Sequence, residues 1–413
     1  MTDTNDLIAA AMIEDDAGDV IQEALEFVRS HMDMEVAYLS EFVGDNLTFR
    51  RVSAPGLEEM IAVGDSMPLD QVYCPHILAG RLPELIPDTD QEPFAQTIPL
   101  TQALPIRSHV SIPIRKRDGS PYGMFCCLSR EARPTLNGRD LDVMRAFATL
   151  SSETINSGLT EQAFKDELRE KLTKVMDGAG FDIAYQPIMV GEARKPAGFE
   201  ALCRFKSEPY RSPDLWFAEA HSVGLQAELE VCVIEKALQA LEVLPPHLYL
   251  SVNASPETVA EGKLRDVFAK FAPERIVLEI TEHSIIGNYD ALLKEVERLR
   301  YIGVRIAIDD AGAGYAGLQH IVKLCADIIK LDMSLTSGID QDVVKRSLAS
   351  AMVGFAEETG AKIVAEGVET EGELGILLDL GVELIQGYLL GRPADLDSAL
   401  ALCQTSASAR RRA

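Results

Sequence analysis

Six short apolar runs in the second half of the chain each end at a polar or charged residue. The runs lie at 248–252, 276–278, 304–308, 328–329, 363–365 and 384–385, and the residues that follow them are Asn253, Glu279, Asp309, Lys330, Glu366 and Gln386. Buried parallel strands read as continuous apolar, β-branched runs. When such strands close into a barrel, their C-terminal ends meet on one face. The sequence therefore predicts an oxygen-rich pocket that also holds one fixed cation.

Two further strand-like segments, 183–190 and 197–205, raise the number of predicted strands in this part of the chain to eight. The predicted helices that alternate with them lie at 215–222, 227–244, 255–272, 291–302, 317–324, 342–359 and 371–380. Eight strands alternating with helices are typical of a (β/α)8 barrel. We therefore expect an α/β fold with a TIM-like barrel in the C-terminal part of the chain.

The N-terminal part has a different pattern. A helix is predicted at 19–32 from its apolar spacing, and the predicted strands lie at 36–39, 47–49, 108–115 and 122–129. Seven prolines between residues 68 and 105 indicate an irregular connecting region between the strands. A helix, antiparallel strands and a closing helix are typical of an α+β domain, which we expect to end near residue 155.

A long helical pattern joins the two parts, from residue 137 to about residue 176, and only Gly158 interrupts it. Two interpretations are open. One long helix buries its apolar stripe against a partner in a dimer, or two helices pack on their own domains. We expect an α+β domain at 1–155, a connecting helix at 156–178, a barrel at 179–405 and a disordered tail at 406–413.

The chain is strongly acidic, with a formal net charge of −26 from 65 acidic and 39 basic residues. A groove for extended DNA or RNA needs a basic stripe that displaces counterions, so the charge argues against such a partner. The basic cluster at 410–412 reads as a solvated end of the chain. A phosphate ester can still bind an acidic protein if metal ions reverse the local charge.

The sequence favours a cytoplasmic protein without a membrane partner. No apolar run approaches the ~20 residues of a membrane span, and the polar, acidic start does not resemble a signal peptide. Seven scattered cysteines without a CxxC pair predict reduced, partly buried thiols rather than a disulfide framework or a structural zinc site.

The carboxylates at the predicted strand ends suit divalent metal ions. Glu200, Asn253, Glu279 and Asp309 could surround one Mg²⁺ or Mn²⁺, because hard cations prefer oxygen ligands. Asp309 and the adjacent Asp310 could hold a second ion. Two such ions activate water and stabilise the charge of a phosphoryl displacement.

Lys330 and Glu366 would complete that chemistry. Lys330 could orient the water or neutralise charge on the phosphate, and Glu366 could order water at the second ion or accept a proton. Each strand-end carboxylate, taken alone, could instead cap the following helix. Their convergence on one face favours a catalytic site.

The segment from about 181 to 403 resembles the EAL family of cyclic-di-GMP phosphodiesterases. The motifs that carry the resemblance are Gln186-Pro187-Ile188, Glu200-Ala201-Leu202-Cys203-Arg204, Ser251-Val252-Asn253-Ala254-Ser255, Leu278-Glu279-Ile280-Thr281-Glu282, Ile308-Asp309-Asp310-Ala311-Gly312-Ala313-Gly314-Tyr315, Ile329-Lys330-Leu331-Asp332, Ala365-Glu366-Gly367-Val368-Glu369-Thr370 and Gln386-Gly387-Tyr388. The resemblance implies a modified (β/α)8 barrel whose first strand is antiparallel. It also implies metal-dependent hydrolysis of cyclic-di-GMP to the linear dinucleotide 5'-pGpG.

The resemblance also implies a role for each motif residue. By position, the ligands of the first metal are Glu200, Asn253, Glu279 and Asp309, and those of the second are Asp309 and Asp310. Lys330 resembles the water-orienting lysine, and Glu366 the carboxylate linked to the second metal and to catalysis. Gln186, Arg204 and Gln386 match substrate-contacting or active-site positions, and Glu282 matches the glutamate that anchors the loop after Asp310.

That loop departs from the family pattern. The family usually reads Asp-Phe-Gly-Thr-Gly-Tyr-Ser-Ser-Leu, whereas this chain has Ala311, Ala313, Ala316 and Gly317 in place of the phenylalanine and the hydroxyls. A smaller, glycine-richer loop at 310–318 is expected to be more mobile. In the family this loop couples metal binding to the dimer interface, so the basal rate and its regulation should differ.

The N-terminal domain resembles a GAF sensor module. The supporting pieces are 73–77, 85–90, 111–114 and 122–127. GAF domains bind small molecules or chromophores, or dimerise, and the sequence does not identify the ligand. One Cys and one His, Cys74 and His76, do not complete a tetrahedral metal site, which favours a buried structural role for both.

Three functional hypotheses follow from these features. The first is a homodimeric enzyme that degrades cyclic-di-GMP at a rate set by the GAF-like domain. The second is a non-catalytic receptor that binds cyclic-di-GMP and signals through protein contacts, which the altered loop would favour. The third, a dimerisation scaffold, leaves the strand-end carboxylates unexplained.

Overall fold

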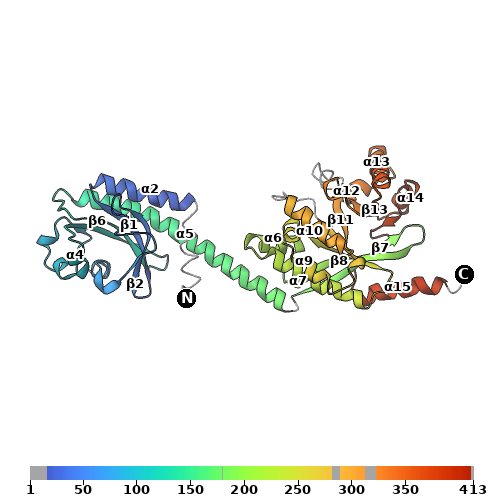
Figure 1. The fold of residues 1–413 in the computed structure, drawn as a ribbon, viewed down its shortest axis with the longest axis horizontal. Helices are drawn as coiled ribbons and strands as arrows, with labels where there is room; N and C mark the ends of the chain where they lie inside the picture. Colours follow the sequence, from blue (N-terminus) through green and yellow to red (C-terminus); the bar gives the residue numbers. More distant parts are fainter. Residues whose placement is uncertain (1–15, 179, 281–288, 312–321, 411–413) are drawn as a thin grey trace. The chain divides into compact units, whose positions relative to one another are not determined.

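The computed structural model describes the backbone of residues 16–178, 180–280, 289–311 and 322–410 (Figure 1). Contacts within the chain divide it into two compact units, Met1–Phe164 and Lys165–Ala413. Among the helices of the described ranges, none is long and apolar enough to cross a membrane.

Unit 1 is built on one antiparallel sheet of six strands in the order β3-β2-β1-β6-β5-β4. The strands are β1 (Val36–Val43), β2 (Asn46–Ser53), β3 (Ser66–Pro68), β4 (Leu85–Ile86), β5 (Ser108–Arg115) and β6 (Pro121–Ser129). The proline-rich region contains β3, β4 and five short helices. These are η1 (Leu69–Gln71), α3 (Cys74–Leu78), η2 (Thr89–Gln91), η3 (Ala95–Thr97) and α4 (Pro99–Ala103). The expected α+β domain is therefore present, and its connecting region is more ordered than the prolines indicated.

The two faces of this sheet pack against different elements. Helix α2 (Asp16–His31) and the first part of α5 (Gly138–Asp177) cover one face, where Leu25 and Met144 pack with Cys127. The short helices cover the other face, where Cys74 packs with Cys126. Successive side chains of a strand point to opposite faces. The adjacent Cys126 and Cys127 of β6 therefore lie in separate hydrophobic cores.

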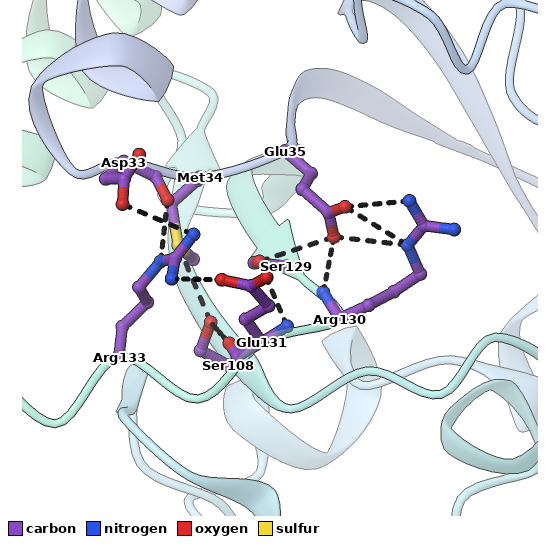
Figure 2. Close-up of polar contacts among 8 residues, drawn as sticks. All are labelled: Asp33, Met34, Glu35, Ser108, Ser129, Arg130, Glu131 and Arg133. Carbon is purple, nitrogen blue, oxygen red and sulfur yellow. Dashed lines mark hydrogen bonds and ion pairs between the residues drawn. The ribbon is translucent and has the colours of Figure 1, made fainter.

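A polar network ties the start of β1 to the end of β6 (Figure 2). Glu35 accepts hydrogen bonds from the backbone nitrogen of Arg130 at 2.6 Å and from its Nη2 at 2.7 Å. Ser129 Oγ donates to the same carboxylate at 3.3 Å. The Arg130 side chain lowers the pKa of Glu35 to about 2, against the opposing effect of partial burial. The pair therefore stabilises the folded state once Glu35 is ionised.

Replacing Glu35 by glutamine should weaken this junction by about 1 kcal/mol at pH 7, a small value because both side chains are partly exposed to water. The folded-state pKa lies below the unfolded one, so the contribution is complete above about pH 4.5 and is lost as the pH falls toward 2. Hydrogen exchange of β1 and β6 should become about fivefold faster in the variant at pH 7. Fluorescence of the single tryptophan, Trp216 of unit 2, should not change. Equal exchange in both proteins would contradict this assignment.

Helix α5 is one continuous helix of 40 residues, which passes through Gly158. Its early part packs on unit 1 through Met144 and Ala148, and its late part packs on unit 2 through Leu168 and Leu172. The interpretation as two separate helices was therefore wrong, because a single helix spans this segment. Glycine lowers helix stability without ending a helix, and here nothing else interrupts the pattern.

Unit 2 contains a closed barrel of eight strands in the order β10-β11-β12-β13-β14-β7-β8-β9 (Figure 1). They are β7 (Phe181–Val190), β8 (Lys195–Phe205), β9 (Tyr249–Ala254), β10 (Ile276–Ile280), β11 (Arg305–Ala311), β12 (Ile328–Leu331), β13 (Lys362–Ala365) and β14 (Leu384–Ile385). Strand β7 is antiparallel to both of its neighbours, and all other pairs are parallel. The predicted modified TIM-like barrel is confirmed.

Helices cover the outside of this barrel. The described ones in unit 2 are α6 (Pro213–Ser222), α7 (Gln226–Leu238), η4 (Gln239–Glu242), α8 (Pro256–Ala260), α9 (Leu264–Phe268), η5 (Pro273–Arg275), α10 (Tyr289–Tyr301), α12 (Met333–Thr336), α13 (Val343–Thr359), α14 (Glu371–Asp379) and α15 (Leu396–Arg410). The single helix predicted at 255–272 is wrong, because Gly262 has a φ of +76° between α8 and α9. Most of the helix predicted at 317–324 lies outside the described residues.

Candidate active site

Strand register explains how the barrel brings the predicted side chains together. An apolar layer fills the barrel interior with Ile188, Tyr249, Val277, Ala307, Ile328, Val364 and Leu384. Side chains two positions apart on a strand point to the same side. Glu279, Asp309, Lys330, Glu366 and Gln386 each follow an interior apolar residue by two positions. The polar residues therefore form the next layer inside the barrel, toward the C-terminal ends of the parallel strands.

Lys330 lies at the centre of this layer and is almost completely buried. Its Nζ is 2.6 Å from Glu279 Oε2, 2.6 Å from Glu366 Oε1, 3.1 Å from Asp309 Oδ1 and 3.4 Å from Glu200 Oε2. Four carboxylates thus face one ammonium group. When all are ionised, the cluster carries three negative charges in excess.

Amide side chains orient Glu200 within the cluster. Gln386 Nε2 donates to Glu200 Oε2 at 2.6 Å, and Asn253 Nδ2 donates to Glu200 Oε1 at 2.9 Å. The same Gln386 nitrogen lies 3.2 Å from Gln186 Oε1. Glu200, on β8, therefore has both oxygens held by residues of other strands.

The ionisation of the cluster reflects its excess negative charge. Burial disfavours charge on Glu200, but Lys330 and the two amide donors hold its pKa below the usual range. Burial and the neighbouring carboxylate of Glu200 raise the pKa of Glu279 well above normal. Burial likewise raises the pKa of Glu366 to about 8, despite the ammonium beside it. One ammonium is thus too little positive charge for four carboxylates, and an added cation would be favoured here.

The oxygen donors and the excess negative charge of these residues both suit divalent metal ions. All donors are oxygens, which suits Mg²⁺ or Mn²⁺. Within the described residues, the buried atoms Asp309 Oδ1, which Lys330 Nζ approaches at 3.1 Å, and Gln386 Oε1 have no hydrogen bond of good geometry. Among the side chains that are described, no three acidic, His or Cys groups are already arranged as metal ligands. Lys330 lies between the carboxylates, so binding of an ion would require some of its contacts to open.

A pocket of about 530 Å³ adjoins the cluster. Glu200, Asn253 and Asp309 form part of its wall, and Arg204 lines it at the end of β8. Arg204 Nη1 donates to the carbonyl oxygen of Cys203 at 2.8 Å, and its other donors have no hydrogen-bond partner among the described residues. The pocket can thus present a cationic group and the carboxylate cluster to the same ligand.

The structure brings together most of the residues predicted from the sequence. Glu200, Gln186, Asn253, Glu279, Asp309, Lys330, Glu366 and Gln386 share one network of contacts. Arg204 lies on the pocket wall. Glu282, the side chain of Asp310 and the loop at 312–318 lie outside the described residues. The role assigned to each residue stays a prediction.

Sequence reasoning missed Ser251, a buried residue of β9. Its hydroxyl donates a hydrogen bond to Glu279 Oε1, the oxygen that Lys330 does not contact. Ser251 precedes Asn253 by two positions and therefore points to the same side of the strand. The two-residue spacing from Asn253 could have indicated that Ser251 faces the site. A serine within an apolar run is, however, also common in strands that have no functional role.

Known proteins resemble both parts of the chain. The family model of the EAL domain matches residues 166–393, and that of the GAF domain matches residues 16–155. The cyclic di-GMP phosphodiesterase NbdA of Pseudomonas aeruginosa is 30% identical over 242 residues, which make up 56% of this chain and 31% of NbdA. The probable cyclic di-GMP phosphodiesterase PdeA of Escherichia coli K12 is 32% identical over 209 residues, 48% of this chain and 28% of PdeA.

A solved structure of the PaMucR phosphodiesterase in complex with c-di-GMP also resembles this chain. The identity is 29% and the TM-score 0.52, over 56% of this chain and 99% of that one. The chain spans about a third of the length of the curated relatives that it matches.

Proposed function

Because this chain belongs to the EAL domain family, we propose that it hydrolyses one phosphodiester bond of cyclic-di-GMP and releases linear 5'-pGpG. The observation that supports this most is Lys330 within a shell of four carboxylates, beside a pocket of about 530 Å³. The named relatives are phosphodiesterases of this compound, which gives the substrate class.

In this proposal Glu200, Asn253, Glu279, Asp309 and Asp310 hold two Mg²⁺ or Mn²⁺ ions. When bound, such ions supply an activated water and neutralise charge on the phosphate. Glu200 is ready to act as a ligand because Gln386 and Asn253 already fix both of its oxygens.

The remaining groups orient the reactants and move the proton. Burial opposes the charge on Lys330, but its carboxylate neighbours raise the pKa of the ammonium above its usual value, so Lys330 is positively charged. It orients the water and stabilises the phosphate. Glu366, whose pKa burial raises to about 8 in the metal-free cluster, is the group that would accept and release the proton. Arg204 binds the substrate from the pocket wall. Gln186 and Gln386, which contact each other inside the buried network, are the other two proposed substrate-binding residues.

A non-catalytic receptor for cyclic-di-GMP is the second candidate, which the altered loop at 310–318 favours. Binding measured in Ca²⁺ and followed by exchange into Mg²⁺ separates the two. An enzyme binds the nucleotide in Ca²⁺ and releases linear product after the exchange, whereas a receptor retains intact nucleotide in both metals. Retention of intact nucleotide in Mg²⁺ and in Mn²⁺ would overturn the enzyme assignment.

Ser251 should hold Glu279 in position for metal binding. Replacing Ser251 by alanine should weaken the apparent affinity for Mg²⁺ by about 10–100-fold, the usual effect of losing a hydrogen bond to a metal ligand. The measurement is the Mg²⁺ dependence of hydrolysis. The exposed Ser347 of α13, replaced by alanine, is the control and should leave that dependence unchanged. Equal Mg²⁺ dependence in all three proteins would show that Ser251 has no such role.

We further propose that the domains expected from the sequence have separate functions. The GAF-like domain at 1–155 binds a small molecule and, through α5, regulates the barrel domain of a cytoplasmic, homodimeric enzyme. The continuity of α5 from unit 1 into unit 2 supports this coupling.

The middle of α5 offers a direct test of that coupling. Replacing Gly158 by proline breaks the helix at a cost of about 3 kcal/mol and should change the rate or the oligomeric state. Replacing it by alanine, which favours the helix by about 0.5–1 kcal/mol, should preserve both. Hydrolysis assays and light scattering provide the two readouts. If the proline variant matched the wild type in both, α5 would not transmit regulation.

A further inference from the structure

Glu366, the proposed proton acceptor, is the first residue of a short segment, 366–370, that joins β13 to α14. Its carboxylate lies 2.6 Å from the Lys330 ammonium. Its backbone N–H donates to the carbonyl oxygen of Leu331, at the end of β12, at 3.1 Å. Its own carbonyl oxygen accepts a hydrogen bond from Thr336 Oγ1. Contacts from β12 and α12 therefore fix both backbone groups of Glu366.

Thr336 is buried and is the last residue of α12, a helix of four residues. A helix this short is not stable alone, so its place depends on contacts with the rest of the barrel. The segment after β13 approaches it closely. Gly367 has a φ of +63°, and a Cβ at this position would collide with the Cβ of Met333. The hydrogen bond from Thr336 to Glu366 thus depends on the contact between α12 and residues 366–370.

Glu373 of α14 joins the two sides of that contact. Its side chain is buried, and Oε1 accepts a hydrogen bond from the N–H of Gly338, just beyond the end of α12, at 2.8 Å. Oε2 accepts from the N–H of Glu369 at 2.9 Å and from that of Thr370 at 3.0 Å. One carboxylate oxygen therefore holds the end of α12, and the other holds the segment that begins at Glu366.

Helix capping accounts for only part of this arrangement. Thr370 and Glu373 form a capping box at the start of α14, in which Thr370 Oγ1 accepts from the N–H of Glu373 at 3.2 Å. A capping box requires the glutamate to accept only from the N–H of the capping residue. The hydrogen bonds from Gly338 and Glu369 lie outside it. They are therefore better explained by the joining of the two segments.

The charge of Glu373 is also held by backbone groups. Burial opposes its ionisation, but the N–H groups of Gly338, Glu369 and Thr370 hold the pKa of this carboxyl below its usual value. Within the described ranges, no cationic side chain forms an ion pair with it. An ionised oxygen accepts stronger hydrogen bonds than a neutral one, so the two segments are held by charge-assisted bonds.

We propose that Glu373 is a positioning residue for Glu366, a role that rests on the proposed hydrolysis of cyclic-di-GMP. Glu373 holds the end of α12 against residues 366–370, so that Thr336 reaches the carbonyl oxygen of Glu366. The Glu366 carboxylate then stays at the Lys330 ammonium. Without Glu373, the backbone N–H groups lose their acceptor and the two segments separate. A misplacement of a reacting group by about 1 Å lowers a rate by about 10²-fold.

The test compares Glu373→Ala with Thr370→Ala in the full-length chain at saturating Mg²⁺. Each variant loses one half of the capping box, but Thr370→Ala keeps the backbone N–H of residue 370 and all acceptors of Glu373. We expect kcat for cyclic-di-GMP to fall by about 10–100-fold in Glu373→Ala. KM should not change, because Glu366 is not among the proposed substrate-binding residues. Thr370→Ala should keep kcat near that of the wild type.

Amide hydrogen exchange in the metal-free protein gives a second readout, which does not depend on hydrolysis. The N–H groups of Gly338 and Glu369 should exchange faster in Glu373→Ala and at the wild-type rate in Thr370→Ala. A third variant acts at the other end of the contact. Thr336→Val removes the hydroxyl that reaches Glu366 and keeps the shape of the side chain, so it should lower kcat as Glu373→Ala does.

Two results would overturn the inference. Equal kcat in Glu373→Ala and Thr370→Ala would reduce Glu373 to a helix cap, and unchanged exchange at Gly338 would show that it does not hold α12. If Glu373→Ala does not fold, wild-type kcat in Thr336→Val decides against the inference. An inactive wild type would instead contradict the proposed function, and the exchange rates would still decide whether Glu373 joins the two segments.

Discussion

Replacing Lys330 by methionine should lower the rate of cyclic-di-GMP hydrolysis by about 10²–10³-fold, the usual effect of removing one electrostatic group from a catalytic site. The ammonium contacts Glu200, Glu279, Asp309 and Glu366, so its loss leaves four carboxylates without their common counter-charge. Breaking a buried ion pair in this way also costs about 3–5 kcal/mol of stability. The measurement is product formation at saturating Mg²⁺, with circular dichroism to confirm folding.

Two further variants separate charge from structure. Lys330→Arg keeps the positive charge but not the compact ammonium, so it should fold better than Lys330→Met while remaining slow. Lys362→Met removes an exposed lysine at the start of the neighbouring strand and should be fully active. Wild-type turnover by a folded Lys330→Met protein would rule out the proposed role of this residue.

Replacing Glu279 by glutamine should raise the stability of the metal-free barrel by about 1 kcal/mol at pH 7, because folding opposes the ionisation of this buried carboxyl, whereas the unfolded chain ionises it freely. The pKa of Glu279 is raised in the folded state. The wild type therefore loses stability as the pH rises above about 4.5, the value for an unfolded glutamate, and this loss should shrink in the variant. Trp216, buried in unit 2, reports this unfolding by fluorescence.

The same variant should lose the response to metal. In the wild type, Mg²⁺ or Mn²⁺ at about 100 times its dissociation constant should stabilise the barrel by roughly 2.7 kcal/mol. The Glu279→Gln protein should show little of this gain and little hydrolysis. Glu358, exposed on α13, provides a matched control as Glu358→Gln. An undiminished metal response in the Glu279 variant would remove Glu279 from the ligand set.

The polar residues at the strand ends could be predicted because the apolar run and the alternation of side chains along a strand both point to the same position. Each buried strand reads as an apolar run, and the first polar residue after the run falls on the inside of the barrel by the two-residue alternation. The same rule located Asn253, Glu279, Asp309, Lys330 and Glu366. The barrel and its polar layer were therefore accessible from the sequence.

Other features depend on contacts between distant parts of the chain. Glu35 and Arg130 are 95 residues apart, and no local pattern pairs them. The hydrogen bond from Ser251 to Glu279 requires the register between β9 and β10. Helical spacing continues across Gly262, so the break between α8 and α9 is set by backbone conformation rather than by the apolar pattern. The sequence predicts that Lys330 lies near carboxylates, but only the structure shows that it contacts four of them.

The central claim is that this carboxylate cluster hydrolyses cyclic-di-GMP. Its most direct test is chromatographic analysis of cyclic-di-GMP incubated with the purified full-length chain in Mg²⁺ or Mn²⁺, beside the Glu200→Ala variant. We predict the linear dinucleotide from the wild type and none above background from the variant, since Glu200 joins Lys330, Asn253 and Gln386 in one network. Equal product from both proteins, or none from the wild type in either metal, would contradict the claim.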